Sequence, residues 1–135
     1  MSLWFVRISN VLAVTTFLAM NAFQSANAAP QDYRFEAVQS DVKSGPAVII
    51  GARLIDVRTG KAVPGATIQD FRFDMSPTGM ASMTSKVTAV EAQDPGVYMY
   101  RAPITMDGEW ALHLSAKVPG EADVVRGSVK IRARK

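Results

Sequence analysis

The sequence contains no cysteine and a single histidine, His113, and these two shortages exclude several kinds of site. Without thiols there is no disulfide framework, no thiolate metal centre and no cysteine nucleophile. One imidazole cannot form a His-pair metal site, and no Gly-x-Ser-x-Gly elbow or phosphate-cradling glycine loop accompanies it. We therefore expect a protein that is not an enzyme.

Long apolar runs are also scarce, and the one present lies at the N-terminus, at 11–23. It is followed by Ala26 and Ala28, which fit the small-x-small rule of signal peptidase and leave Ala29 as the first residue after cleavage. A run of about 13 residues is shorter than the roughly 20 needed to span a bilayer, which disfavours the alternative of an uncleaved anchor. We expect a signal peptide over 1–28, a periplasmic or secreted protein, and no membrane span after cleavage.

The net charge of the chain that remains after the predicted cleavage is small. Without Arg7 of the leader, residues 29–135 hold 14 basic and 12 acidic side chains, largely interspersed. The exception is the basic tail at 130–135, and charges spaced along a terminal strand are typical of a solvated face. Because an exported protein rarely meets nucleic acid, we expect no nucleic-acid partner.

Short runs rich in β-branched and aromatic residues recur along the mature chain, whereas helical periodicity is weak. Turns containing Gly, Pro or Asp separate these runs at roughly 8–12-residue spacing. The pattern predicts an all-β, Ig-like Greek-key sandwich of about seven strands, preceded by the signal-peptide helix. The expected strands cover 33–40, 46–57, 65–74, 84–91, 96–103, 108–117 and 123–133. The first strand falls in an N-terminal segment, 29–44, and the sandwich domain proper in 45–135.

Alternation within two of these strands makes local predictions. In 110–114 the Trp and both Leu share one face, and His113 lies on the other. In 66–73 neither face is uniformly apolar, which predicts a β-bulge or a bend near Asp70. The segment 94–98 resembles the tyrosine corner of Ig-like sandwiches, in which the phenol bonds to an upstream backbone group.

Methionine is the unusual component of the chain. Of seven methionines, two belong to the leader and the other five lie between residues 75 and 106. Met75, Met80 and Met83 fall in the segment 75–83, which contains a Pro and a Gly and is expected to be the longest loop. Thioether sulfur is a soft, neutral ligand suited to Cu(I) or Ag(I). The sequence therefore predicts a soft-metal site at these three methionines.

Other residues and roles compete with this interpretation. Met99 and Met106 are secondary candidate ligands, but they sit in or beside strands, where methionine commonly fills irregular gaps in a core. His113 could add an imidazole, although a lone strand histidine is more often simply exposed. The methionine loop could instead form an adaptable protein-binding surface.

Several segments of the chain resemble the YtkA-like/FixH-like family of small exported or membrane-anchored Ig-like domains. The resemblance covers about residues 45–133 and rests on 51–56, 59–66, the methionine-rich loop, 95–98 and 106–112. Its most specific pieces are a Gly-Lys-x-Val-x-Gly-Ala turn and an Asp-Gly-Glu-Trp-x-Leu strand.

The resemblance implies a periplasmic accessory protein of copper or silver handling, without catalysis. The family's methionine motif corresponds to Met75, Met80 and Met83, and the implied partner is an efflux or copper-delivery complex. We expect a monomer. The competing hypothesis is a non-metal Ig-like interaction module that docks on an envelope or efflux complex.

Overall fold

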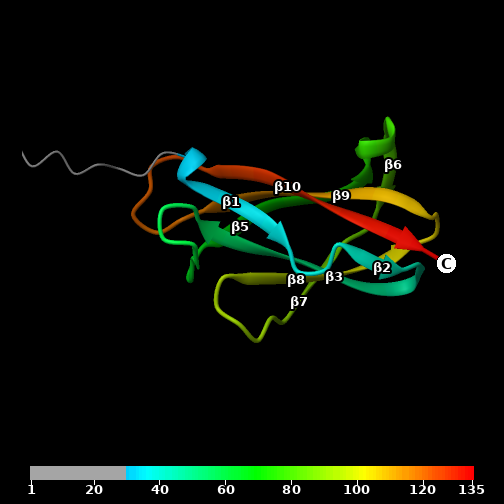
Figure 1. The fold of residues 1–135 in the computed structure, drawn as a ribbon, viewed down its shortest axis with the longest axis horizontal. Helices are drawn as coiled ribbons and strands as arrows, with labels where there is room; N and C mark the ends of the chain where they lie inside the picture. The colour runs from blue at the N-terminus through cyan, green and yellow to red at the C-terminus, as the bar shows by residue number, and fades with distance from the viewer. Residues whose placement is uncertain (1–29) are drawn as a thin grey trace, which may run out of the picture.

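The structure, a computed structural model, describes residues 30–135, which form two β-sheets packed face to face (Figure 1). The expected cleavage site at Ala26, Ala28 and Ala29 lies outside this range. Within 30–135 no helix has the length and apolar character needed to cross a bilayer. The regular elements are the 3₁₀ turns η1 (Pro30–Asp32) and η2 (Ser76–Thr78) and the strands β1 (Tyr33–Ala37), β2 (Asp41–Lys43), β3 (Gly45–Asp56), β4 (Lys61–Ala62), β5 (Thr67–Met75), β6 (Met80–Ser85), β7 (Thr88–Val90), β8 (Val97–Ile104), β9 (Gly108–Lys117) and β10 (Val125–Arg134).

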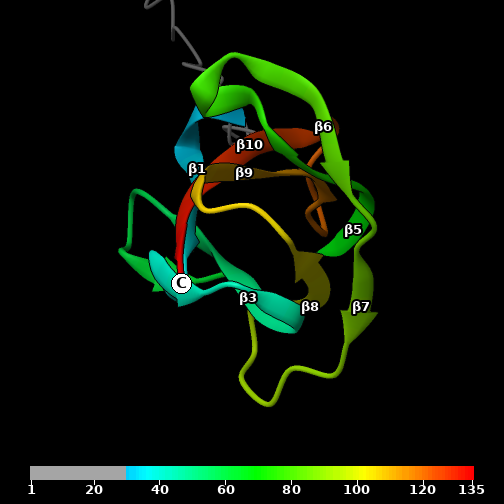
Figure 2. The same cartoon turned by 90° about the vertical axis from the view of Figure 1, so that its right-hand side faces the viewer.

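The strands divide into two sheets of five. Sheet A has the order β1-β3-β8-β7, with β4 also paired to β3, and sheet B has the order β2-β10-β9-β5-β6. Neighbours pair antiparallel except β2 and β10, which are parallel. Viewed along the strands in Figure 2, β9 and β10 of sheet B lie above β3 and β8 of sheet A. The all-β, Ig-like sandwich expected from the sequence is confirmed.

Alternating residues of both sheets fill the space between the layers, as the pleat of a strand requires. The rings of Phe73 and Trp110 stack at a centroid distance of 4.9 Å, and the indole Nε1 donates to the Met106 carbonyl oxygen at 3.1 Å. A buried indole therefore keeps its hydrogen bond while its ring contributes apolar area. The largest fully buried side chains are Trp110, Phe73, Ile50, Leu54, Met75, Ile104, Leu112, Ile131 and Val125.

The seven expected strands are all present, as β1, β3, β5, β7, β8, β9 and β10, and β2, β4 and β6 are additional short strands. β1 pairs with β3, so the N-terminal segment is part of the same sandwich. In β9 the predicted alternation is confirmed, because the Trp and both Leu of 110–114 are buried while His113 is partly exposed. The register of β9 is therefore set by its apolar face.

The irregularity expected near Asp70 is a β-bulge. Against β9, Ile68 pairs with Ala116 and Asp70 pairs with Ser115, so Gln69 is the extra residue. The bulge resets the alternation, which places the inner-face residues on both sides of it toward the sandwich interior. Two strand faces that looked mixed in sequence thus become one inner and one outer face.

Tyr98 does bond to an upstream backbone group, but not in a local corner. Its hydroxyl donates to the carbonyl oxygen of Ala66 at 3.1 Å, a residue 32 positions away that precedes β5. This bond links β8 of sheet A to the segment that leads into β5 of sheet B.

The prediction of a long loop over 75–83 was wrong. Met75 is the last residue of β5, η2 follows it, and β6 begins at Met80. The turn between the strands depends on Gly79, which has φ 79° and whose N–H donates to the Ser76 carbonyl oxygen at 2.9 Å. Glycine adopts this left-handed conformation at little cost. The segment is therefore a hairpin and not an open, flexible loop.

Candidate functional site

The structure separates Met75 from the other two methionines of the predicted metal site. Met75 is only 1% exposed and lies in the core, on the same side of β5 as Phe73. A Cβ built on Gly108 would lie 3.0 Å from its terminal methyl group. Met75 is therefore a packing residue, and the expectation that it presents its sulfur in a loop was wrong, because β5 extends farther than its pattern suggested.

Met80 and Met83 keep the exposure that a ligand role needs. Both lie on β6, and each is 38% exposed. Met80 pairs with Met75 across the hairpin, and the register is irregular between that pair and the next one, Asp74 with Thr84. Since β6 is the edge strand of sheet B, its side chains are reachable from solvent.

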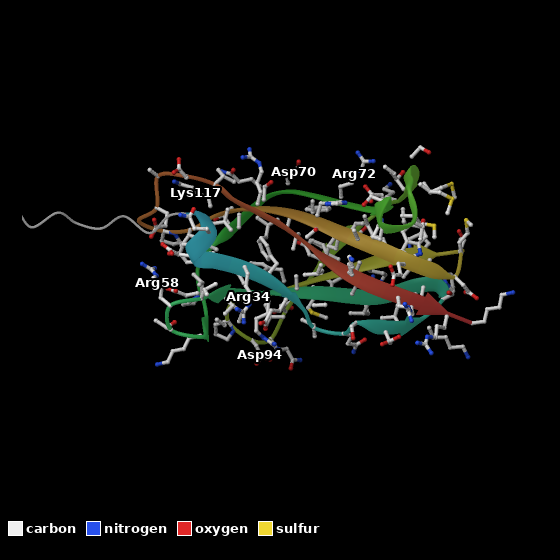
Figure 3. The ribbon with its side chains drawn as sticks, turned by 45° about the horizontal axis from the view of Figure 1, so that its top comes forward. Arg34, Arg58, Asp70, Arg72, Asp94 and Lys117 are labelled. Carbon is white, nitrogen blue, oxygen red and sulfur yellow. The ribbon has the colours of Figure 1, made fainter. Side chains whose placement is uncertain are left out.

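Met106 is a third exposed methionine at this end of the sandwich. It lies in the β8–β9 turn and is 38% exposed. The buried Met75 connects the two locations: it pairs with Met80 on one side, and its methyl group lies close to Gly108 on the other. In Figure 3 the yellow sulfur atoms lie mostly toward the end of the molecule where β6 turns back from β5. We call Met80, Met83 and Met106 the methionine end.

Met99 lies elsewhere. It pairs with Gly51 on the outer face of sheet A, and a Cβ on Gly51 would come within 2.3 Å of its sulfur. The Met99 thioether thus covers the backbone of a glycine, a packing contact separate from the methionine end.

The best-defined polar cluster surrounds Asp74, which directly precedes Met75. This carboxylate is 2% exposed. Its Oδ2 forms an ion pair with Arg72 Nε at 2.8 Å, and its Oδ1 accepts from the Ser76 backbone N–H at 3.0 Å and lies 3.1 Å from His113 Nε2. Asp74 therefore joins β5, η2 and β9 at the base of the hairpin that carries Met80.

The surroundings of Asp74 lower its pKa. Burial acts to raise the pKa, but hydrogen bonds from Ser76 and from His113 outweigh it and favour the charged form. A carboxylate held by several donors is stabilised in its ionised state. The cluster is thus a charged anchor at neutral pH.

Asp74, His113 and Ser76 have the composition of a nucleophilic triad but not its geometry. The Ser76 hydroxyl oxygen lies 3.2 Å from His113 Nε2, the same ring nitrogen that contacts Asp74. A triad needs the acid on one ring nitrogen and the nucleophile on the other, so that the imidazole can pass a proton between them. This arrangement can order a turn but cannot relay a proton.

Sequence reasoning did not identify the Asp74 cluster. It treated His113 as a possible soft-metal ligand, whereas the structure engages His113 Nε2 with Asp74 and Ser76. One signal was available: the only histidine lies on the outer face of a strand, where a neighbouring carboxylate could reach it. Which strand lies beside β9 could not be derived from local pattern.

Comparisons with solved structures return Ig-like and filamin-like domains at low identity. The chain covers 98% of the Lin-41 filamin domain at 13% identity and a TM-score of 0.43, with 81% of this chain aligned. It aligns over its whole length with 86% of the ZirS C-terminal domain, at 13% identity and a TM-score of 0.43. For the Yersinia pseudotuberculosis adhesin InvE the identity is 16%, the TM-score is 0.41, and 79% of this chain is aligned. The chain spans only 28% of that adhesin.

The comparison with protein families is more specific. No curated protein matches the chain. The profile of the YtkA-like family matches residues 27–115, from before β1 to β9, while the FixH-like part of the resemblance receives no support. The match includes the methionine hairpin, the Asp74 cluster and the β8–β9 turn. With about two thirds of its length matched, the chain belongs to the YtkA-like family.

Proposed function

We propose that this protein is a periplasmic accessory protein of copper or silver handling, which binds Cu(I) or Ag(I) through thioethers of the methionine end. The observation that carries the proposal is the exposure of Met80, Met83 and Met106, each 38%, on β6 and in the β8–β9 turn at one end of the sandwich. Thioethers bind soft monovalent cations and, unlike thiolates, form no disulfides in an oxidising compartment.

The scaffold supports this role because it holds the hairpin in place. Asp74 bonds to the Ser76 amide, and the Thr78 hydroxyl donates to the Met75 carbonyl oxygen at 2.9 Å. Both bonds lie in the connection that leads to Met80. A ligand-bearing segment with fewer conformations to lose binds with a smaller entropic penalty.

The test is a Cu(I) titration of the protein purified from the periplasm of an expressing bacterium, in competition with a chromogenic chelator. We expect about one ion per chain, and a loss of affinity of at least about tenfold when Met80→Leu and Met83→Leu are combined. The mass of the purified chain checks cleavage after Ala28 in the same sample. Leucine keeps side-chain volume and removes the sulfur, so the fold is preserved.

Met99→Leu is the matched control, because it removes one thioether from the outer face of sheet A and leaves the methionine end intact. We expect it to bind Cu(I) like the wild type. Absence of binding by the wild type would end the metal proposal. A partner protein that is retained after metal chelation, and lost in the Met80/Met83 variant, would instead favour the interaction-module hypothesis.

A further inference from the structure

The outer face of sheet B carries a second group of functional side chains, which is independent of the methionines. Along β10, apolar residues point inward and polar residues point outward, in strict alternation. The outward residues of this strand are Arg126, Ser128, Lys130, Arg132 and Arg134. Four cations on one face of a single strand repel one another unless they are neutralised.

Two of these four cations are neutralised. Arg132 Nη2 lies 2.8 Å from Glu109 Oε1, and Arg134 Nη2 lies 3.3 Å from Asp41 Oδ1. Glu109, whose pKa is lowered by Arg132 and also by Lys130, partly neutralises Lys130 as well. Within 30–135 the side chain of Arg126 has neither an ion pair nor a hydrogen bond, and it lies about 7 Å from Ser128 along the strand.

A hollow of about 410 Å³ lies beside Arg126, whose side chain lines it. The sheet register explains its shape: Ser128 pairs with His113, and Ser115 pairs with Arg126. Two small hydroxyl side chains thus form the floor, and longer side chains form the walls. The lining residues are Asp70, Arg72, His113, Leu114, Ser115, Arg126, Gly127 and Ser128.

The charged side chains in the walls of the hollow are not all neutralised to the same degree. Arg72 is held by Asp74 and by the Ala81 carbonyl oxygen, 2.5 Å from its Nη2, so its guanidinium is fixed at the rim. Figure 3 shows Asp70 and Arg72 projecting to the same side of β5. Asp70 is the only carboxylate of the lining, and it stands across the floor from Arg126, with Ser115 between them.

We propose that this hollow binds a phosphate-type oxyanion above Ser128, with Arg126 as the charged donor and the hydroxyls of Ser115 and Ser128 as neutral ones. A tetrahedral anion presents several oxygens and can meet donors from the wall and the floor of the hollow together, whereas a carboxylate presents only two. Arginine in particular matches phosphate with two parallel N–H bonds.

His113 forms a wall of this site and is not one of its donors. Its Nε2 is already engaged, 3.1 Å from Asp74 Oδ1 and 3.2 Å from the Ser76 hydroxyl oxygen. The donors that the proposal requires are Arg126, Ser115 and Ser128, which makes the substitution test specific.

The test is a titration of the ¹⁵N-labelled protein with inorganic phosphate at constant ionic strength, followed by amide NMR shifts, with acetate as the comparison anion. We expect saturable shifts centred on Ser115 and Ser128, and weaker binding of acetate. Arg126→Gln should weaken phosphate binding about tenfold, the loss expected for one charge-assisted interaction. Unchanged dispersion of the other amide signals would show that this variant is folded.

Arg101→Gln is the matched control, since it removes the same charge from an exposed position on sheet A. It should leave phosphate binding unchanged. Equal losses in both variants, or shifts spread over all cationic positions, would overturn the site in favour of general charge attraction.

A second arm identifies the source of the phosphate. Co-sedimentation with phosphatidylglycerol vesicles that depends on Arg126 would support the site and assign the anion to a lipid headgroup. Phosphate binding without co-sedimentation would support the site with a free or small-molecule phosphate. The proposal would be overturned if phosphate caused no amide shifts and co-sedimentation did not depend on Arg126.

Discussion

The two halves of β5 differ sharply in environment although they belong to one continuous strand. Residues 67–72 are exposed or half-buried, whereas Phe73, Asp74 and Met75 are at most 2% exposed. Within 30–135 the first half pairs only with β9, while the second half pairs with β9 and with β6. Burial here follows the number of neighbouring strands and not the polarity of the residue, since Phe71 is 37% exposed and Asp74 is buried.

The largest difference in unfolding free energy should be between alanine variants of the two phenylalanines of β5. Phe73→Ala removes a ring stacked on Trp110 and should cost about 3–5 kcal/mol of unfolding free energy. Phe71→Ala removes a ring that is 37% exposed and lies against Tyr100 at a centroid distance of 5.0 Å, and it should cost about 1 kcal/mol. Urea denaturation of both variants measures the difference. Equal losses would show that the packing around Phe71 is as tight as the packing around Phe73.

Alanine substitutions of Met75 and Met80, which pair across the hairpin, should also differ in their effect on stability. Met75→Ala leaves a cavity in the core and should cost about 2–5 kcal/mol. Met80→Ala changes an exposed side chain and should stay within about 0.5 kcal/mol of wild type. Thermal unfolding of the metal-free protein provides the measurement. A neutral Met75→Ala would contradict the assignment of this residue to the core.

A smaller, pH-dependent effect is expected at Asp74. Because its folded-state pKa is lowered, its contribution to stability is complete above the unfolded-state pKa of about 3.9 and is lost as pH falls through the folded-state pKa. Asp74→Asn should cost about 1–3 kcal/mol at pH 7. It should also reduce the loss of stability below about pH 4.

Asp70→Asn serves as the control for this experiment, since Asp70 lies on the same strand but is exposed. Urea denaturation at neutral and acidic pH compares the variants. If Asp74→Asn and the wild type lost stability in parallel on acidification, the buried carboxylate would not be the group that titrates.

The methionine site shows which features of this protein cannot be predicted from local sequence pattern alone. Composition indicated an exported domain rich in exposed thioethers, and Met80 and Met83 are indeed exposed. The residues near Met75 in the chain did not predict its burial, because its terminal methyl group lies against Gly108, which is 33 positions away. The same holds for Asp74, whose partner His113 is 39 positions away.

Strand positions, the alternation of 110–114 and an irregularity near Asp70 all follow from short-range properties: side-chain period, β-branching and turn residues. These properties are encoded within a few residues, so they can be read from the chain directly. The neighbours of each strand, the closure of the hairpin over Asp74 and Met75, and the grouping of Arg126 and Ser128 with His113 and Arg72 depend on sheet order and register. Sheet order brings together residues that are distant in the chain, and only the folded packing of all the strands decides it.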